Sequence, residues 1–479
     1  MREFAIRWFH VLERLAFVPL SFMGVGLYRA WLAIFFRYGA YPGMGVSDYA
    51  LFEVSISVVC LAAAFAHRRV SPLWSNSRAL LSAGVAMVVG AIGCAVQAFW
   101  IPLDLIKYLG LVLAGAGLGI AILVWCEFYG ALNPMRVAVY HAASIFFGEL
   151  LCWFFTTVSA PGLVAMSVVL PPLTLWWAHV AVTKLPEVER PRPLPDPTAL
   201  VVPWKPIALM ATCTFATGFG TLPDQPLVLG NVVGCLGATA LVFFGSLSTS
   251  RWFNFDVIYR LAFPLLSVSL LLIMPLVSKT PQVTAACFDA GYTMLSMFIM
   301  IILSNITYRF GIDAVWLNGI ERGIRYLIEA LGWGTFAISN ACLEPGANVV
   351  VHVVVMSTVI VIFLVIVLQE KSLAARWGID IKAGGNGDPG DVFSPGQLSM
   401  RVSDLSKRFG LSDREEEVLQ LMVRKVPVAQ MEEELFVARG TIKAHTNHIY
   451  KKCGVKGRKE LFELIGVDEG DARGDLHEG

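Results

Sequence analysis

The chain has 479 residues, of which 56% are hydrophobic, and its 37 Lys and Arg nearly balance its 36 Asp and Glu. A mean hydropathy of +0.65 excludes a wholly soluble protein. Long apolar runs fill residues 15–368, whereas charged residues concentrate at the two ends and after Gln369. The nine cysteines show no CxxC pair and no Cys/His ligand spacing, so the sequence predicts neither a disulfide framework nor a zinc site.

The apolar runs have the length of membrane-spanning helices, because about twenty apolar residues cross the hydrocarbon core of a bilayer. The basic segment 1–14 leads into such a run without a small-residue cleavage site, which indicates a retained first helix. We therefore predict an all-α membrane domain at 1–370, embedded in the lipid bilayer. The twelve predicted spans are 15–36, 49–66, 79–100, 107–127, 137–158, 162–182, 206–221, 227–247, 260–277, 285–306, 318–340 and 348–368.

Basic residues in the loops predict the orientation of these spans. With the N-terminus inside, only Arg37, Lys107 and Lys279 lie at the outer side. This is the positive-inside asymmetry, and it predicts a multi-pass protein of the bacterial inner (cytoplasmic) membrane with both termini in the cytoplasm. The basic residues assigned to the cytoplasmic loops are Arg68, Arg69, Arg78, Arg136, Lys184, Arg190, Arg192, Lys205, Arg251, Arg260, Arg309, Lys371 and Arg376.

A proline-rich linker at 183–204 divides the spans six plus six. Basic loops at 67–78 and 250–260 follow the second span of each half, as in transporters built from two related halves. In span number and symmetry the membrane domain resembles the major facilitator fold. Major facilitators usually carry glycine and aspartate in the first of these loops. Residues 67–78 contain neither, which argues against transport.

Ionisable residues within the spans indicate functional sites or buried ion pairs, because a charge is costly to place in a membrane. Span eleven carries Glu321, Arg325 and Glu329 at intervals of four, which forms a charged stripe on one helix face. One hypothesis is a small-molecule or ion pocket between the halves. The competing interpretation is a set of interhelical ion pairs, for example Arg29 with Glu53. The candidate ligand or intramembrane polar residues are Arg29, Glu53, Glu127, His141, Glu149, Arg325 and Glu329.

The polar remainder of the chain is divided into three parts. Residues 371–405 include Gly384-Gly-Asn-Gly-Asp-Pro-Gly-Asp and are predicted to form a flexible cytoplasmic tether. About twenty residues of this composition reach roughly 25 Å. Residues 406–468 have the apolar spacing of a small domain of four helices, and residues 469–479 are predicted to be a disordered tail.

Start and stop signals place the four helices. Ser412 followed by Glu415 is a capping box that opens the first. Pro427 suits the first turn of the second. The third is expected over 440–453, and Gly454 ends it. A fourth follows a few residues later.

The third of these helices is strongly basic. Residues 439–459 contain seven Lys or Arg and no Asp or Glu, whereas the first two helices carry acidic runs at 415–417 and 432–434. One helix thus presents the positive surface that duplex phosphates require.

The runs Leu411-Ser-Asp-Arg-Glu-Glu-Glu-Val-Leu-Gln-Leu and Gly440-Thr-Ile-Lys-Ala-His-Thr-Asn-His-Ile-Tyr-Lys-Lys resemble a LuxR-type helix-turn-helix. The resemblance implies that the third helix enters the major groove, with base contacts from Lys443, Ala444 and Asn447. It implies a homodimer on DNA through the fourth helix. It assigns phosphate contacts or helix positioning to the others in the DNA-binding set, which comprises Arg439, Thr441, Lys443, Ala444, His445, Asn447, Lys451 and Lys452.

No P-loop, HExxH, nucleophile elbow or dinucleotide fingerprint occurs, so the sequence predicts neither an enzyme nor a cofactor. The predicted function is a membrane-embedded one-component transcriptional regulator. It senses an unknown small molecule through the membrane domain and binds promoter DNA through the C-terminal domain. Two alternatives are a secondary transporter with an appended regulatory DNA-binding head, and a membrane-tethered scaffold whose head binds protein.

Overall fold

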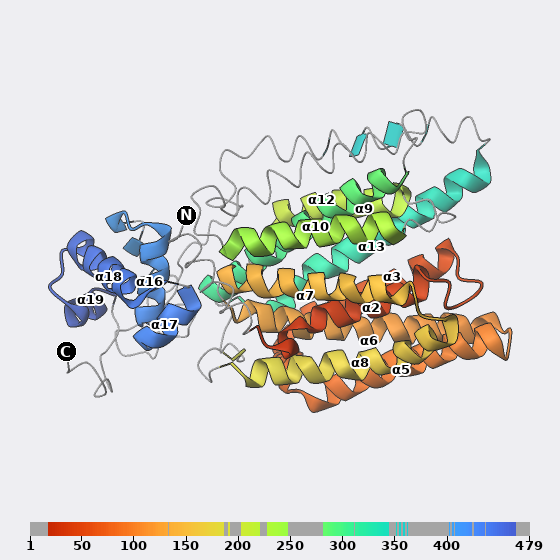
Figure 1. Cartoon of the computed structure of the whole chain (residues 1–479), viewed down its shortest axis with the longest axis horizontal. Helices are drawn as coiled ribbons and strands as arrows, with labels where there is room; N and C mark the ends of the chain where they lie inside the picture. The colour runs from red at the N-terminus through yellow and green to blue at the C-terminus, as the bar shows by residue number, and fades with distance from the viewer. Residues whose placement is uncertain are drawn as a thin grey trace. The chain divides into compact units, whose positions relative to one another are not determined.

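The chain divides into two compact units: a helical body, which holds residues 1–193, 201–305 and 313–380, and a unit that contains residues 381–479. All regular secondary structure in the described residues is helical (Figure 1). The computed structural model describes residues 18–132, 134–185, 190–191, 203–220, 228–247, 281–310, 312–343, 351, 354–355, 358–359, 362, 402, 405–406, 408–423, 426–435 and 437–465.

The body is built from long apolar helices. Six of them are long and apolar enough to cross a membrane, and two more apolar stretches are shorter, so the chain is a multi-pass membrane protein. The first half contains η1 (Leu20–Met23), α2 (Gly24–Phe36), α3 (Val46–Phe65), α4 (His67–Val70), η2 (Leu73–Ser75), α5 (Ser77–Phe99), α6 (Asp104–Gly130), α7 (Pro134–Phe155) and α8 (Ala160–Thr183). The second half contains α9 (Trp204–Gly220), α10 (Val228–Leu247), α12 (Pro281–Phe310) and α13 (Ala314–Cys342).

Ten of the twelve predicted spans correspond to described helices whose ends differ from the prediction by a few residues. In the first, η1 and α2 together cover residues 20–36. The predicted span at 260–277 lies outside the described residues, as do most positions of the span at 348–368. The tether at 371–405 and the tail at 469–479 lie largely or wholly outside them, and so does most of the linker at 183–204.

The two halves of the body meet along α3 and α13, which run antiparallel, and also along α7 and α10. Near one end, a Cβ on Gly319 of α13 would lie 2.8 Å from a backbone carbonyl oxygen of α3, so only glycine permits this approach. Further along, Ser57 Oγ donates to the Gly323 carbonyl oxygen at 2.7 Å. At the other end the rings of Tyr49 and Trp333 stack with centroids 5.0 Å apart.

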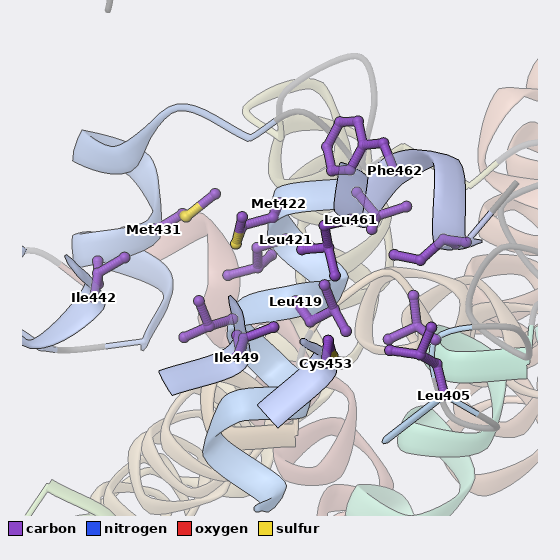
Figure 2. Close-up of a cluster of buried hydrophobic side chains, with 14 of the residues drawn as sticks. Leu405, Leu419, Leu421, Met422, Met431, Ile442, Ile449, Cys453, Leu461 and Phe462 are labelled. Carbon is purple, nitrogen blue, oxygen red and sulfur yellow. The ribbon is translucent and has the colours of Figure 1, made fainter. Parts of the chain in front are cut away.

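The C-terminal domain has a hydrophobic core of its own (Figure 2). Leu419, Ile449 and Leu461 come from three different helices, and each is completely buried. Cys453 and Phe462 complete the same cluster. The helices are α16 (Asp413–Val423), α17 (Val428–Leu435), α18 (Arg439–Cys453) and α19 (Arg458–Ile465).

The helix ends follow the predicted signals. The Ser412 backbone N–H donates to Glu415 Oε2 at 2.7 Å and the Glu415 N–H donates to Ser412 Oγ at 3.3 Å, which confirms the capping box. The Pro427 carbonyl oxygen accepts a hydrogen bond in the first turn of α17. Gly454 ends α18 with a left-handed φ of 68°, whereas Ala438 opens it without a side-chain hydrogen bond.

Replacing Ala438 with serine should stabilise the domain. Its backbone is already extended, with φ −68° and ψ 151°, as at a capped helix start. A serine oxygen there can accept an N–H of the first turn, so we expect Ala438→Ser to add about 0.5–1 kcal/mol to the free energy of unfolding. Urea unfolding of fragment 400–479 measures this. Ala438→Val, which adds no acceptor, is the control, and equal midpoints for the two variants would contradict the prediction.

Candidate nucleic-acid interface and intramembrane polar cluster

Helix α18 turns one apolar face to the domain core and one polar face to solvent. Ile442, Ile449 and Cys453 are buried in the core, at the spacing of one helix face. His445 is half-buried at the edge of that face. The exposed residues are Arg439, Gly440, Thr441, Lys443, Ala444, Asn447, His448, Lys451 and Lys452.

The residues predicted to read bases lie on the exposed face. Lys443, Asn447 and Lys451 follow one another at intervals of four residues, which corresponds to about 6 Å of helix per interval. Ala444 lies beside them. The face therefore offers a cation, an amide and a small apolar side chain in sequence. These are groups that pair with guanine, adenine and the thymine methyl group in a major groove.

Lys452 differs from the other basic residues of α18, because its amino group is bound within the domain. Its Nζ donates to Glu415 Oε2 at 2.6 Å and to the Gly410 carbonyl oxygen at 3.0 Å. Glu415 is buried, and the same oxygen accepts the Ser412 N–H. One carboxylate thus closes the capping box of α16 and holds the last turn of α18.

The electrostatics of Glu415 reflect these partners. Burial would raise the pKa of the carboxyl group, but the hydrogen bonds from Lys452 and Ser412 outweigh it and lower the pKa to about 2. His448 Nδ1 lies 3.9 Å from Glu415 Oε1. Of the two roles that the LuxR resemblance left open for Lys452, this geometry favours helix positioning. The sequence contained the capping-box signal for Glu415, but not its pairing with Lys452, which needs the packed fold.

The ion pair of Glu415 should make the domain sensitive to acid. Because the pKa is lowered from 4.5 to about 2, its contribution to stability is present above pH 4.5 and is lost as the pH falls toward 2. Glu415→Gln should lower the free energy of unfolding at neutral pH by roughly 1.5–3 kcal/mol and flatten this acid decrease. Urea unfolding of fragment 400–479 across that pH range is the measurement.

The exposed Glu463 provides a matched control, and Glu463→Gln should leave the acid profile unchanged. If Glu415→Gln and the unaltered fragment gave parallel profiles, the Glu415 pair would not be the source of the acid sensitivity.

In the helical body, Arg29 joins α2 to α7 and α10. Its Nη2 lies 3.4 Å from Glu149 Oε1 and 3.9 Å from Cys235 Sγ. The expected Arg29–Glu53 pair is therefore wrong. Helix α2 packs against α7, which turns Arg29 toward Glu149, whereas Glu53 belongs to the contact of α3 with α13.

Two residues of the charged stripe of α13, Glu321 and Arg325, are buried inside the body, and Glu329 is half-buried. The Glu321 carboxylate is completely buried, 3.2 Å from Arg322 Nε and 3.8 Å from Arg325 Nη1. Arg325 also donates to Ser296 Oγ at 3.3 Å and to the Tyr292 hydroxyl, both on α12. The i, i+4 spacing of the sequence thus corresponds to an ion pair between Glu321 and Arg325 that is tied to a neighbouring helix.

His141 of α7 lies in the field of these arginines. The charges of Arg29, Arg322 and Arg325 all act on its imidazole. The ring packs edge-on against Tyr129 with centroids 4.9 Å apart. Within the described residues, neither His141 Nδ1 nor the Tyr129 hydroxyl has a hydrogen-bond partner. Buried polar atoms are normally satisfied, so an unpaired pair of this kind favours contact with water or a ligand.

Glu127 is separate from this cluster and makes structural contacts. Its two carboxylate oxygens accept the backbone N–H groups of Leu73 and Trp74 at 2.7 and 2.9 Å. Trp74 Nε1 in turn donates to the Pro191 carbonyl oxygen at 3.0 Å. Glu127 therefore holds the loop that follows α4 and ties it to the segment after α8.

Glu53 of α3 and Glu329 of α13 belong to the two helices along which the halves meet. The charge of Glu329 acts on Glu53, and that of Arg325 acts on both. Sequence analysis assigned both glutamates to the polar set but did not pair them. Glu53 follows Tyr49 by four residues, and Glu329 precedes Trp333 by four. Because Tyr49 stacks on Trp333, this spacing places the two glutamates on facing positions, but only if α3 and α13 are known to be antiparallel.

Comparison with known proteins identifies the C-terminal domain. Residues 410–465 match bacterial regulatory proteins of the luxR family. Over 71 residues the chain is 31% identical to the spore germination protein GerE of Bacillus subtilis (strain 168), and the alignment covers 15% of this chain and 96% of GerE. The chain belongs to the luxR family. Its C-terminal domain is a LuxR-type DNA-binding domain.

Two solved structures are similar to a larger part of the chain. A crystal structure of a major facilitator superfamily transporter, FucP, in the outward conformation aligns with 74% of this chain and 96% of that chain, at 12% identity and a TM-score of 0.43. A crystal structure of the E. coli fucose:proton symporter aligns with 76% and 98%, at 13% identity and a TM-score of 0.44. The likeness concerns the helical fold alone.

Proposed function

We propose that this protein is a membrane-embedded one-component transcriptional regulator. Its helical body senses a small molecule and its C-terminal domain binds promoter DNA. The observation that carries the proposal is the union, in one chain, of a LuxR-type DNA-binding domain and a multi-pass helical body. Such a chain takes a signal from the membrane to DNA without a separate partner.

In this proposal Lys443, Ala444 and Asn447 contact bases, and Arg439, Thr441, His445 and Lys451 contact phosphates or position the helix. The exposure of all but His445 supports the assignment. Phosphate contacts supply affinity that does not depend on sequence, whereas contacts to base edges supply specificity. Lys452 acts by holding α18 in place through Glu415.

The domain binds DNA as a homodimer through α19. Leu464 on this short helix is 42% exposed, although its neighbours Leu461 and Phe462 are buried. An exposed leucine on the helix that family resemblance assigns to dimerisation supports this step. Two copies would place two α18 helices on half-sites one turn of DNA apart.

Both termini lie in the cytoplasm in this proposal, which delivers the domain to DNA. Lys107 is one of the few basic residues assigned to the outer side. It is buried and bound to Asp48 at 3.1 Å, so its charge is neutralised within the protein. The asymmetry of unpaired loop charges that orients membrane proteins is thereby increased.

The sensing step relies on the buried cluster of Arg29, Arg322, Arg325 and His141. Ionisable groups inside a membrane bundle are costly unless they are paired or serve a ligand. Arg29 pairs with Glu149, and Arg322 and Arg325 pair with Glu321, whereas His141 Nδ1 has no hydrogen-bond partner among the described residues. The unpaired atoms of His141 and Tyr129 support a polar ligand contact at this place.

Gel shifts with fragment 400–479 test the DNA-binding half. The probes are genomic fragments that the fragment itself selects from a pool. Lys443→Ala and Asn447→Ala should each weaken specific binding by roughly 5- to 150-fold, the cost of about 1–3 kcal/mol for a lost base contact. Lys451→Ala should weaken specific and non-specific binding alike and reduce the salt slope by about one.

Lys459→Ala is the matched control, because it removes an exposed lysine from α19. It should leave the discrimination between selected and random DNA unchanged. Loss of discrimination in the control, or its retention in both Lys443→Ala and Asn447→Ala, would remove α18 from base reading.

A further inference from the structure

The contact between α3 and α13 is antiparallel and is fixed at two places. Tyr49 stacks on Trp333 with centroids 5.0 Å apart, and Ser57 Oγ donates to the Gly323 carbonyl oxygen at 2.7 Å. Glu53 lies midway between the two residues of α3. In antiparallel helices the position opposite it is therefore about midway between 323 and 333, which is where Glu329 lies. We call the line of contacts from Tyr49–Trp333 to Ser57–Gly323 the seam.

Two polar atoms near the centre of the seam, one on Glu53 and one on Trp333, have no hydrogen-bond partner among the described residues. Glu53 is 8% exposed, and its Oε2 accepts no hydrogen bond from the described residues. The Trp333 indole lies close enough to act on the Glu53 carboxyl group, yet its Nε1 has no hydrogen-bond partner by geometry. Glu329 is half-buried on the facing helix. A buried carboxylate that faces another one is unfavourable when both are ionised.

The cations near the seam do not neutralise this pair. Arg322 pairs with Glu321, and Arg325 lies near Glu321 and also acts on Glu53 and Glu329, so two cations stand against three carboxylates and one negative charge is in excess. Arg325 is further committed to hydrogen bonds with α12. Arg37 after α2 acts on Tyr49 of α3, but the carboxylates that act most strongly on Arg37 are those of Asp289 and Glu149, outside the seam. The remaining titratable or charged groups around the seam are Lys107 of α6 with its partner Asp48, Cys213 of α9 and Tyr292 of α12.

We propose that Glu53 and Glu329 form a proton-binding site that closes the seam. With one shared proton the pair carries a single negative charge, which balances the excess charge around Arg322 and Arg325, and the two halves of the body stay together. Loss of the proton leaves two facing carboxylates, whose repulsion separates α3 from α13.

The site also suggests how a change in its protonation alters the structure elsewhere in the chain. This part of the inference rests on the proposed regulatory function. Helix α3 ends at Phe65 and continues directly into α4. The His67 ring of α4 packs 5.2 Å from Trp316 of α13. Separation of the seam therefore moves the loop after α4, which Glu127 ties to the segment after α8.

The melting temperature of the full chain in lipid nanodiscs, measured between about pH 5 and about pH 9, tests the site. A bound proton stabilises the closed seam, so the melting temperature of the unaltered protein should fall as the pH rises. Glu53→Gln and Glu329→Gln mimic the protonated carboxyl group. Each should raise the melting temperature by roughly 2–4 °C at the alkaline end and change little at the acid end. The double variant should gain no more than either single one, because the two share one proton.

Ser57→Ala is the matched control, since it removes a seam hydrogen bond without a titratable group. Its curve should run parallel to that of the unaltered protein. Parallel curves for the two glutamine variants, or an additive double variant, would overturn the proposal. So would stabilisation by sodium but not by choline, which would make the pair a metal-cation site. If the variants do not fold, infrared spectroscopy of the unaltered protein replaces them. A protonated carboxyl group should give a band that disappears as the pH rises, and a spectrum without such a band would overturn the proposal.

DNA occupancy by the full chain in membranes tests the regulatory step separately. Occupancy of a selected DNA fragment should change between the acid and alkaline ends, and Glu329→Gln should abolish the change. If DNA occupancy did not depend on pH while the melting curves were as expected, the proton-binding site would stand but its regulatory role would be excluded. Failure of fragment 400–479 to bind any DNA would instead overturn the proposed function.

Discussion

The cost of placing charge in an apolar interior governs the arrangement of the helical body. Every ionisable side chain within the spans must find a partner on another helix or lie where polar molecules reach it. Arg29 finds Glu149 across α2 and α7, and Arg325 finds Ser296 and Tyr292 on α12. These ion pairs and hydrogen bonds therefore also tie neighbouring helices of the body together.

Hydropathy predicted most of this body because a membrane-spanning helix needs only length and apolar composition, both of which are visible in a single sequence. The sequence did not show which ionisable side chains pair with one another. Arg29 and Glu53 have similar depth, but depth does not say which face of α2 meets which neighbour. Gly319 shows the same limit, since its role depends on how closely the backbone of α3 approaches it. Long-range packing, and not local composition, decides both cases.

The DNA-binding domain was more predictable, because its signals are local. The capping box at Ser412, the left-handed Gly454 and the buried spacing of Ile442 and Ile449 each depend on residues within two turns of one another. The contact between Lys452 and Glu415, in contrast, joins residues that are 37 positions apart. On the sequence alone Lys452 resembles the other lysines of the basic helix, and only the fold separates a lysine that holds the helix from those that face outward.

The position of that contact has a mechanical consequence. Gly410 and Glu415, the two acceptors of Lys452, lie near the N-terminal end of the domain in the sequence. Val402 and Leu405 precede Gly410 and belong to the hydrophobic core, so a force that reaches the domain along the chain is borne by the core before it reaches the anchor of α18. The orientation of α18 therefore follows the folded domain as a whole, and the domain moves as one body.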